Sequence, residues 1–170
     1  FISVISLIAL LYQSYLAREE NKLIQMQQSA SVLPHLNQWY SNYNNTFKFV
    51  VGNKGVGPAF IDEVEIALDS EHKFNNTKDL FDYIFKNNKV LDTIPYTYST
   101  LVEGFVLPAN EQIDILEIKN AKHIQPIRDA LNNENIIYKI VYKDVYGSKW
   151  VLTNDNTNGT STNIPITSEK

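Results

Sequence analysis

The stretch FKFVVGNKGVGPAFIDEVEIALD, from Phe47 to Asp69, consists of two apolar runs separated by the glycine-rich segment NKGVGPA at residues 53–59. This segment is either a phosphate-binding loop or a turn that lets the chain fold back. A phosphate-binding loop leads into the N-terminus of a helix, because the backbone N–H groups that hold the phosphate converge there. The residues that follow the segment therefore decide between the two interpretations.

The residues after the glycines indicate a strand. Val64, Ile66 and Leu68 alternate with residues that would face the other way, which is the period of a half-buried strand. The glycine-lysine-serine or -threonine ending of a phosphate loop is also absent. We therefore predict a structural turn, in which the glycines supply unusual backbone angles and the proline starts a strand or lies on an edge. The turn consists of Asn53, Gly55, Gly57 and Pro58.

The period of two recurs along most of the chain after His35. Alternating segments occupy residues 46–51, 62–69, 99–109, 111–118 and 135–153, and the last contains a turn at 145–148. Helical spacing occurs at residues 77–88, with Thr77 as the expected N-cap, and at residues 120–133. Many short strands are typical of a β-sandwich. We predict a mainly β fold: an immunoglobulin-like antiparallel β-sandwich with two short helical insertions, preceded by an N-terminal transmembrane and neck helix.

Residues Phe1–Ala17 form an uncharged, mostly apolar run. A membrane-spanning helix needs about 20 such residues, and we expect more of them upstream because the chain begins with phenylalanine. A signal peptide fits less well because residues 15–17 are a poor cleavage site, and a buried core helix would carry a clearer polar stripe. We predict a transmembrane anchor formed by Phe1, Ile2, Val4, Ile5, Leu7, Ile8, Leu10 and Leu11.

The helical pattern continues beyond the apolar run as a polar neck. Leu16, Leu23 and Ala30 recur every seven residues, so the neck either pairs as a coiled coil or stands as a single solvated helix. Arg18 and Lys22 lie on the domain side of the run, and positive flanking charge favours the cytoplasmic side of a membrane. We predict attachment to a bacterial inner membrane. The predicted parts are an anchor and neck at 1–30, a sandwich at 31–153 and a flexible polar tail at 154–170.

Composition and spacing exclude several classes of function. The 170 residues carry a net charge of −4, which provides no basic surface for nucleic acid. No cysteine is present, so disulfides and thiol catalysis are excluded. His35, His72 and His123 lie on different predicted elements without a metal-ligand spacing. We predict no catalytic, cofactor or metal site and no enzyme; a hydrolase or small-ligand receptor with a site assembled from distant residues is the alternative.

One combination of motifs resembles a known group of proteins. The segment NKGVGPAFIDEVEI follows LPHL at residues 33–36 and precedes VYKDVYGSKW at residues 141–150. In this order the motifs resemble a set of bacterial membrane-anchored proteins, most of them uncharacterised, over nearly the whole chain. The resemblance implies a short N-terminal transmembrane segment and one immunoglobulin-like sandwich with an N-x-G-x-G-P-A segment. It implies no catalytic residues.

Aromatic residues interleaved with small polar ones suggest a protein-binding surface. Tyrosine offers a large contact area at low entropy cost. The candidates for exposure and partner contact are Tyr40, Tyr96 and Tyr98, and packing of these rings inside the sandwich is the alternative. We predict a single-pass membrane-anchored interaction module, a subunit or accessory protein of a bacterial membrane assembly. Its predicted partners are the lipid bilayer and another protein, or a second copy bound through the membrane and neck helix.

Overall fold

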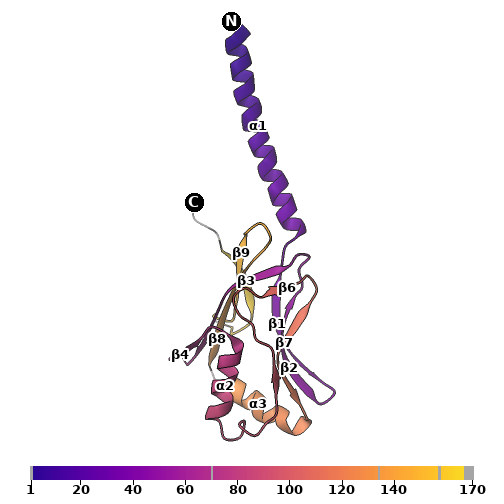
Figure 1. Cartoon of the computed structure of the whole chain (residues 1–170), viewed down its shortest axis with the longest axis vertical. Coiled ribbons are helices and arrows are strands. Elements are labelled where there is room, and N and C mark those ends of the chain that lie inside the picture. The colour runs from indigo at the N-terminus through magenta and orange to yellow at the C-terminus, as the bar shows by residue number, and fades with distance from the viewer. Residues whose placement is uncertain (1, 70, 134, 157, 167–170) are drawn as a thin grey trace.

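The computed structural model describes residues 2–69, 71–133, 135–156 and 158–166, which contain three helices and ten strands. The helices are α1 (Ile2–Ser31), α2 (Thr77–Asn87) and α3 (Ala121–Asn133). The strands are β1 (Leu36–Tyr43), β2 (Thr46–Asn53), β3 (Ala59–Leu68), β4 (His72–Phe74), β5 (Thr97–Tyr98), β6 (Val106–Leu107), β7 (Gln112–Lys119), β8 (Ile136–Lys143), β9 (Lys149–Thr153) and β10 (Thr162–Ile166). Helix α1 projects alone from a compact body formed by the other elements (Figure 1).

The body contains two antiparallel sheets that enclose the core. One sheet has the strand order β1-β2-β7-β5, and the other has the order β10-β9-β8-β3-β4, with β6 paired to β3. Strands β1 and β2 form a hairpin from Leu36↔Asn53 to Tyr43↔Thr46. Its two-residue turn is Asn44-Asn45, with φ angles of 54° and 59°, and asparagine tolerates this left-handed region better than most residues. The predicted mainly β, sandwich-like architecture is therefore confirmed.

Strand β3 shows how the alternating pattern builds the core. Val64, Ile66 and Leu68 are buried, as their spacing predicts. Ile61 is also buried although it lies three residues before Val64. The register against β8 shifts between Ile61 and Glu63, and such a bulge returns the side chains to the same face. The strand therefore contributes apolar side chains to the core along its whole length.

The two predicted helical insertions are present as α2 and α3, and they cover the end of the body away from α1 (Figure 1). The predicted N-cap of α2 is wrong by one residue. The side chain of Asn76 accepts a hydrogen bond from the Asp79 N–H at 2.9 Å. The Thr77 hydroxyl instead donates to the Ser99 carbonyl and accepts from the Leu101 N–H, each at 3.0 Å. Thr77 therefore fastens α2 to the segment that follows it.

Two segments differ from their predicted structure. Residues 99–109 contain only the two-residue strand β6, because the chain turns at Gly104, whose φ angle is 82°. The polar tail predicted from residue 154 onward includes strand β10, which pairs with β9 from Thr162↔Thr153 to Ile166↔Lys149. Because β10 is an edge strand, it accommodates Pro165, which lacks a backbone N–H.

Candidate functional site

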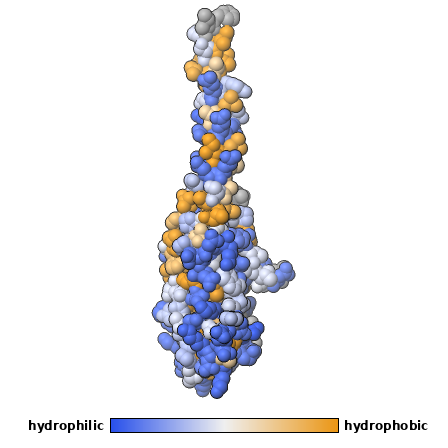
Figure 2. Space-filling model, turned by 90° about the vertical axis from the view of Figure 1, so that its right-hand side faces the viewer, coloured by the Kyte–Doolittle hydropathy of each residue, from blue (hydrophilic) through white to orange (hydrophobic). Residues whose placement is uncertain are grey.

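The apolar half of α1 is exposed. Six of the predicted anchor residues have side chains that are 58–64% exposed: Val4, Ile5, Leu7, Ile8, Leu10 and Leu11. Phe1 lies outside the described residues, as does the side chain of Ile2. Figure 2 shows apolar side chains near the tip of the helix and at its base, with hydrophilic and apolar side chains interspersed between them.

The transmembrane helix predicted at Phe1–Ala17 is not found. Among the described residues, no helix combines the length and the apolar character needed to cross a membrane. The charged residues Arg18, Glu19 and Glu20 follow the apolar run directly, and Glu19 pairs with Lys22 at 3.0 Å. Leu23 and Met26 of the neck are also about 60% exposed, and a coiled coil through this seam stays a prediction.

The base of α1 is fixed to the sandwich by the segment at residues 32–35. The Lys54 N–H donates to the His35 carbonyl at 2.8 Å, and the Val56 N–H donates to the Leu33 carbonyl at 3.0 Å. We call residues 32–35 together with the glycine-rich residues 53–57 the neck joint. It lies where α1 meets the body (Figure 1).

Asn53 is the centre of the neck joint and is fully buried. Its Oδ1 accepts hydrogen bonds from the N–H groups of His35 and Gly55, both at 3.0 Å. Its Nδ2 donates to the carbonyls of Gly57 at 2.7 Å and Leu107 at 3.1 Å. A buried amide that makes four hydrogen bonds has no capacity left for a ligand. The structural role predicted for this turn agrees with these contacts.

The reason predicted for the two glycines of the turn is wrong. Neither Gly55 nor Gly57 has a positive φ angle; the described glycines that do are Gly104, Gly147 and Gly159. Both residues instead lie against the backbone of residues 32–35, directly after α1. A Cβ atom on Gly55 would be 2.2 Å from the Leu33 carbonyl oxygen, and one on Gly57 would be 1.9 Å from that of Val32. Glycine is needed here because a side chain would push α1 away from the sandwich.

A second contact holds α1 at Ser29. Its hydroxyl donates to Asp144 Oδ2 at 2.9 Å. Asp144 is only 2% exposed, and its Oδ1 accepts from the N–H groups of Tyr146 and Ser148 at 2.8 and 2.9 Å. The carboxylate therefore shapes the β8–β9 turn and binds the helix at the same time.

A buried phenol lies next to the neck joint. Tyr142 Oη donates to Asn163 Oδ1 at 2.7 Å and accepts a 3.4 Å hydrogen bond from the Leu36 N–H. Asn163 Nδ2 in turn donates to the Leu36 carbonyl. Burial raises the pKa of Tyr142 to about 12. This cluster ties β10 and β8 to the start of β1, directly after the neck.

The three predicted partner-binding tyrosines differ in exposure. Tyr40 is 60% exposed, and its ring lies 5.7 Å from that of Phe47 and 5.4 Å from that of Phe49. Tyr96 and Tyr98 are only partly exposed and pack against the core, so the exposure predicted for these two is wrong. The alternation of tyrosine with small polar residues in this segment did not indicate that α2 would pack against it.

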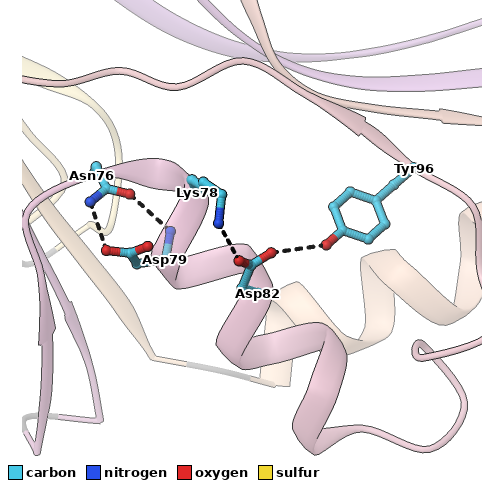
Figure 3. Close-up of polar contacts among 5 residues, drawn as sticks. All are labelled: Asn76, Lys78, Asp79, Asp82 and Tyr96. Carbon is cyan, nitrogen blue, oxygen red and sulfur yellow. Dashed lines mark hydrogen bonds and ion pairs between the residues drawn. The ribbon is translucent and has the colours of Figure 1, made fainter.

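Tyr96 contacts α2 through both its ring and its hydroxyl. Its ring stacks on Phe85 with centroids 3.9 Å apart. Its hydroxyl donates to Asp82 Oδ1 at 3.4 Å, and Lys78 Nζ lies 2.6 Å from the other carboxylate oxygen (Figure 3). The Lys78 ammonium lowers the pKa of Asp82. The ring and the hydroxyl of Tyr96 therefore both contact α2 of the same chain.

The ionisable side chains form ion pairs on the surface of the sandwich. Among the described residues, no group of three or more histidine and acidic side chains is placed to hold a metal ion. His72 Nε2 lies 3.0 Å from the Tyr83 hydroxyl. Asp62 is bonded to Lys143 Nζ at 2.7 Å and to Lys149 Nζ at 2.5 Å, and these hydrogen bonds lower its pKa below the usual 3.8.

Comparison with known proteins does not assign the chain to a family. No protein-family model matches the chain, and no curated protein is significantly similar to it. The resemblance of the N-x-G-x-G-P-A segment to bacterial membrane-anchored proteins therefore stays a prediction.

Proposed function

We propose that this protein is a membrane-attached interaction module, in which α1 inserts its apolar half into a lipid bilayer and holds the β-sandwich for contact with another protein. The observation that carries the proposal is the exposed apolar surface of α1. Successive helical residues are about 100° apart, so the side chains of Val4, Ile5, Leu7 and Leu10 point to different sides. A helix whose exposed surface is mostly apolar is stabilised by an apolar surrounding, whereas a helical partner would cover only one seam.

The neck joint supports the same proposal. Residues Asn53, Gly55 and Gly57 serve to hold the base of α1, and Ser29, in the last turn of α1, adds a second contact to the sandwich. A helix without a role in attachment would not need a buried, four-bonded asparagine at its base. We further propose that the body is an immunoglobulin-like sandwich, which its two antiparallel sheets of short strands support.

Flotation with liposomes tests the attachment. The wild-type chain is expected to float with the vesicles. Replacing Leu7 and Leu10 together by lysine places two charges in the apolar region, at about 3 kcal/mol each, and is expected to release the protein. A matched double variant, Leu23→Lys with Met26→Lys, changes equally exposed residues of the polar neck and is expected to float. Release of both variants, or of neither, would contradict the proposal.

The side of the membrane is tested separately. Arg18 and Lys22 flank the apolar half on the domain side, which supports a cytoplasmic sandwich at a bacterial inner membrane. Protease added to intact spheroplasts is then expected to spare the sandwich, and protease added after lysis to digest it. Rapid digestion in intact spheroplasts would reverse the assignment.

A further inference from the structure

The interior of the sandwich contains a cavity of about 250 Å³ between its two sheets. Apolar side chains from both sheets line it, among them Val51 from β2, Val64 from β3 and Ile115 from β7, together with Phe81 from α2. Protein cores have few voids larger than a water molecule. An apolar cavity of even 150 Å³ stays dry and accepts a small apolar molecule. The cavity therefore has the size and surface of a binding site.

Several polar groups in the wall of the cavity are occupied by hydrogen bonds within the protein, and Tyr40 and Asn135 add a hydroxyl and an amide to the same wall. Asn154 accepts from the Tyr138 N–H and donates to the Ile136 carbonyl, each at 2.8 Å. Tyr138 Oη donates to Gln38 Oε1 at 3.3 Å, and burial raises the pKa of this phenol. The Thr77 hydroxyl is bonded to the backbone on both sides. What the wall offers a ligand is therefore mainly hydrocarbon surface.

A second hollow of about 220 Å³ adjoins the cavity and shares Tyr40 and Leu131 with it. Its lining also includes Arg128 of α3, which is exposed. Within the described residues Arg128 forms no ion pair, whereas seven lysines do. The apolar cavity thus lies next to a hollow whose cation has no ion-pair partner among the described residues.

We propose that the sandwich binds a medium-chain carboxylate, with its hydrocarbon chain in the cavity and its carboxylate at Arg128. A water-sized group takes about 30 Å³ in a liquid, so about eight methylene groups fill 250 Å³. Guanidinium is the side chain best suited to a carboxylate. Arg128 belongs to α3, which lies at the end of the body away from α1 (Figure 1), and the proposed site is independent of the proposed attachment.

Calorimetric titration tests the site. The full chain with Leu7→Lys and Leu10→Lys is used throughout, because these changes prevent the exposed surface of α1 from collecting amphiphile. Hexanoate, octanoate and decanoate are titrated below their micelle concentrations. Affinity is expected to rise about fourfold for each added methylene, from about 0.8 kcal/mol per buried group, and to stop rising once the cavity is filled. The absence of binding by all three acids would overturn the proposal.

Filling the cavity locates the binding site. Val64→Phe is expected to reduce octanoate affinity more than tenfold while the melting temperature stays close to that of the parent chain. Val51→Phe fills the cavity from the facing sheet and provides a second variant if the first does not fold. Val106→Phe adds the same ring at an exposed position outside the cavity and is expected to leave binding unchanged. Parental affinity in a folded Val64→Phe or Val51→Phe variant would overturn the proposal.

Changing the cation tests the head group. Octanoate is expected to bind about two- to fivefold more tightly than 1-octanol, the range for an exposed ion pair. Arg128→Gln is expected to abolish this preference without weakening 1-octanol binding, and Arg128→Lys to retain much of it. Lys122→Gln removes a charge from the same helix outside both hollows and serves as the control. Equal binding of acid and alcohol by the parent chain would overturn the assignment of Arg128.

Discussion

Gly57→Asn tests whether close backbone contact, rather than a left-handed backbone, requires glycine in the neck joint. The new Cβ would lie 1.9 Å from the Val32 carbonyl oxygen, more than 1 Å inside the 3.0 Å that Cβ atoms keep. Overpacking of this kind costs about 1–3 kcal/mol. The neck could instead separate from the sandwich and lose the two backbone hydrogen bonds of Lys54 and Val56, at about 0.5–1.5 kcal/mol each. Both routes predict a loss of about 1–3 kcal/mol.

Gly104→Asn is the matched control. Gly104 has a φ angle of 82° and no atom within 4 Å of a Cβ placed there. Asparagine tolerates the left-handed region, so this variant is expected to lose less than about 1 kcal/mol. Urea unfolding measures both losses, and amide exchange of Val56 reports whether the neck has separated. An equal or larger loss in Gly104→Asn, with unchanged exchange at Val56 in Gly57→Asn, would refute the close-contact explanation.

Substitutions at four further residues test the polar contacts and the packing of Tyr96. Asn53→Leu leaves four buried backbone groups without their partner and is expected to lower the unfolding free energy by more than about 3 kcal/mol in urea titrations. Asp62→Asn should lower the unfolding free energy by about 0.5 kcal/mol at pH 6. This difference should vanish as the pH falls below 3.8 and through the lowered pKa of Asp62, because the ion pairs stabilise the fold only while the carboxylate is ionised. Tyr142→Phe removes the hydroxyl that bonds Asn163 and Leu36 and should lower stability by about 1–2 kcal/mol in the same titrations. Tyr96→Phe should melt close to the wild type, because the hydrogen bond of its hydroxyl to Asp82 is long. Tyr96→Ala should lower the unfolding free energy by about 3 kcal/mol, because the ring no longer packs on Phe85. Loss of a co-purifying protein partner in the folded Tyr96→Phe variant would place the hydroxyl in the interface with that partner.

The sheet-forming segments were predictable because burial on one face leaves a period of two in the sequence. The alternation in β3 and β7 and the helical spacing in α2 and α3 specify the mainly β fold with two insertions. Strand β10 could not be predicted this way, since an edge strand needs little apolar content and tolerates Pro165. Asn76 and Thr77 are adjacent, and both are residue types that cap helices. The Thr77 hydroxyl instead bonds the backbone of Ser99 and Leu101, and the sequence does not show that these residues lie beside it.

The candidate site depended on contacts between distant segments. The sequence indicated that Asn53 and the two glycines form a turn, but it contained no sign that Val32, twenty-five residues before Gly57, would lie against them. The exposure of Tyr96 was mispredicted for the same reason, because α2 covers it through tertiary packing. Similarly, Arg128 and Tyr40 line one hollow only because α3 packs against β2 and β7. Local patterns predict elements, whereas these sites arise from how the elements meet.

The two attachments of α1, at Ser29 and at the neck joint, have a mechanical consequence. Contacts at Ser29 and just after the end of α1 restrict swivelling of the helix, so they favour one height and one tilt of the sandwich relative to whatever holds the far end of the helix. The polar residues from Arg18 to Ser31 give a spacer of about 20 Å at 1.5 Å per residue. That distance exceeds two Debye lengths at physiological salt, about 8 Å each. If α1 inserts as proposed, the sandwich therefore stands beyond the reach of the lipid surface charge, and its contacts depend on its own surface rather than on the membrane below it.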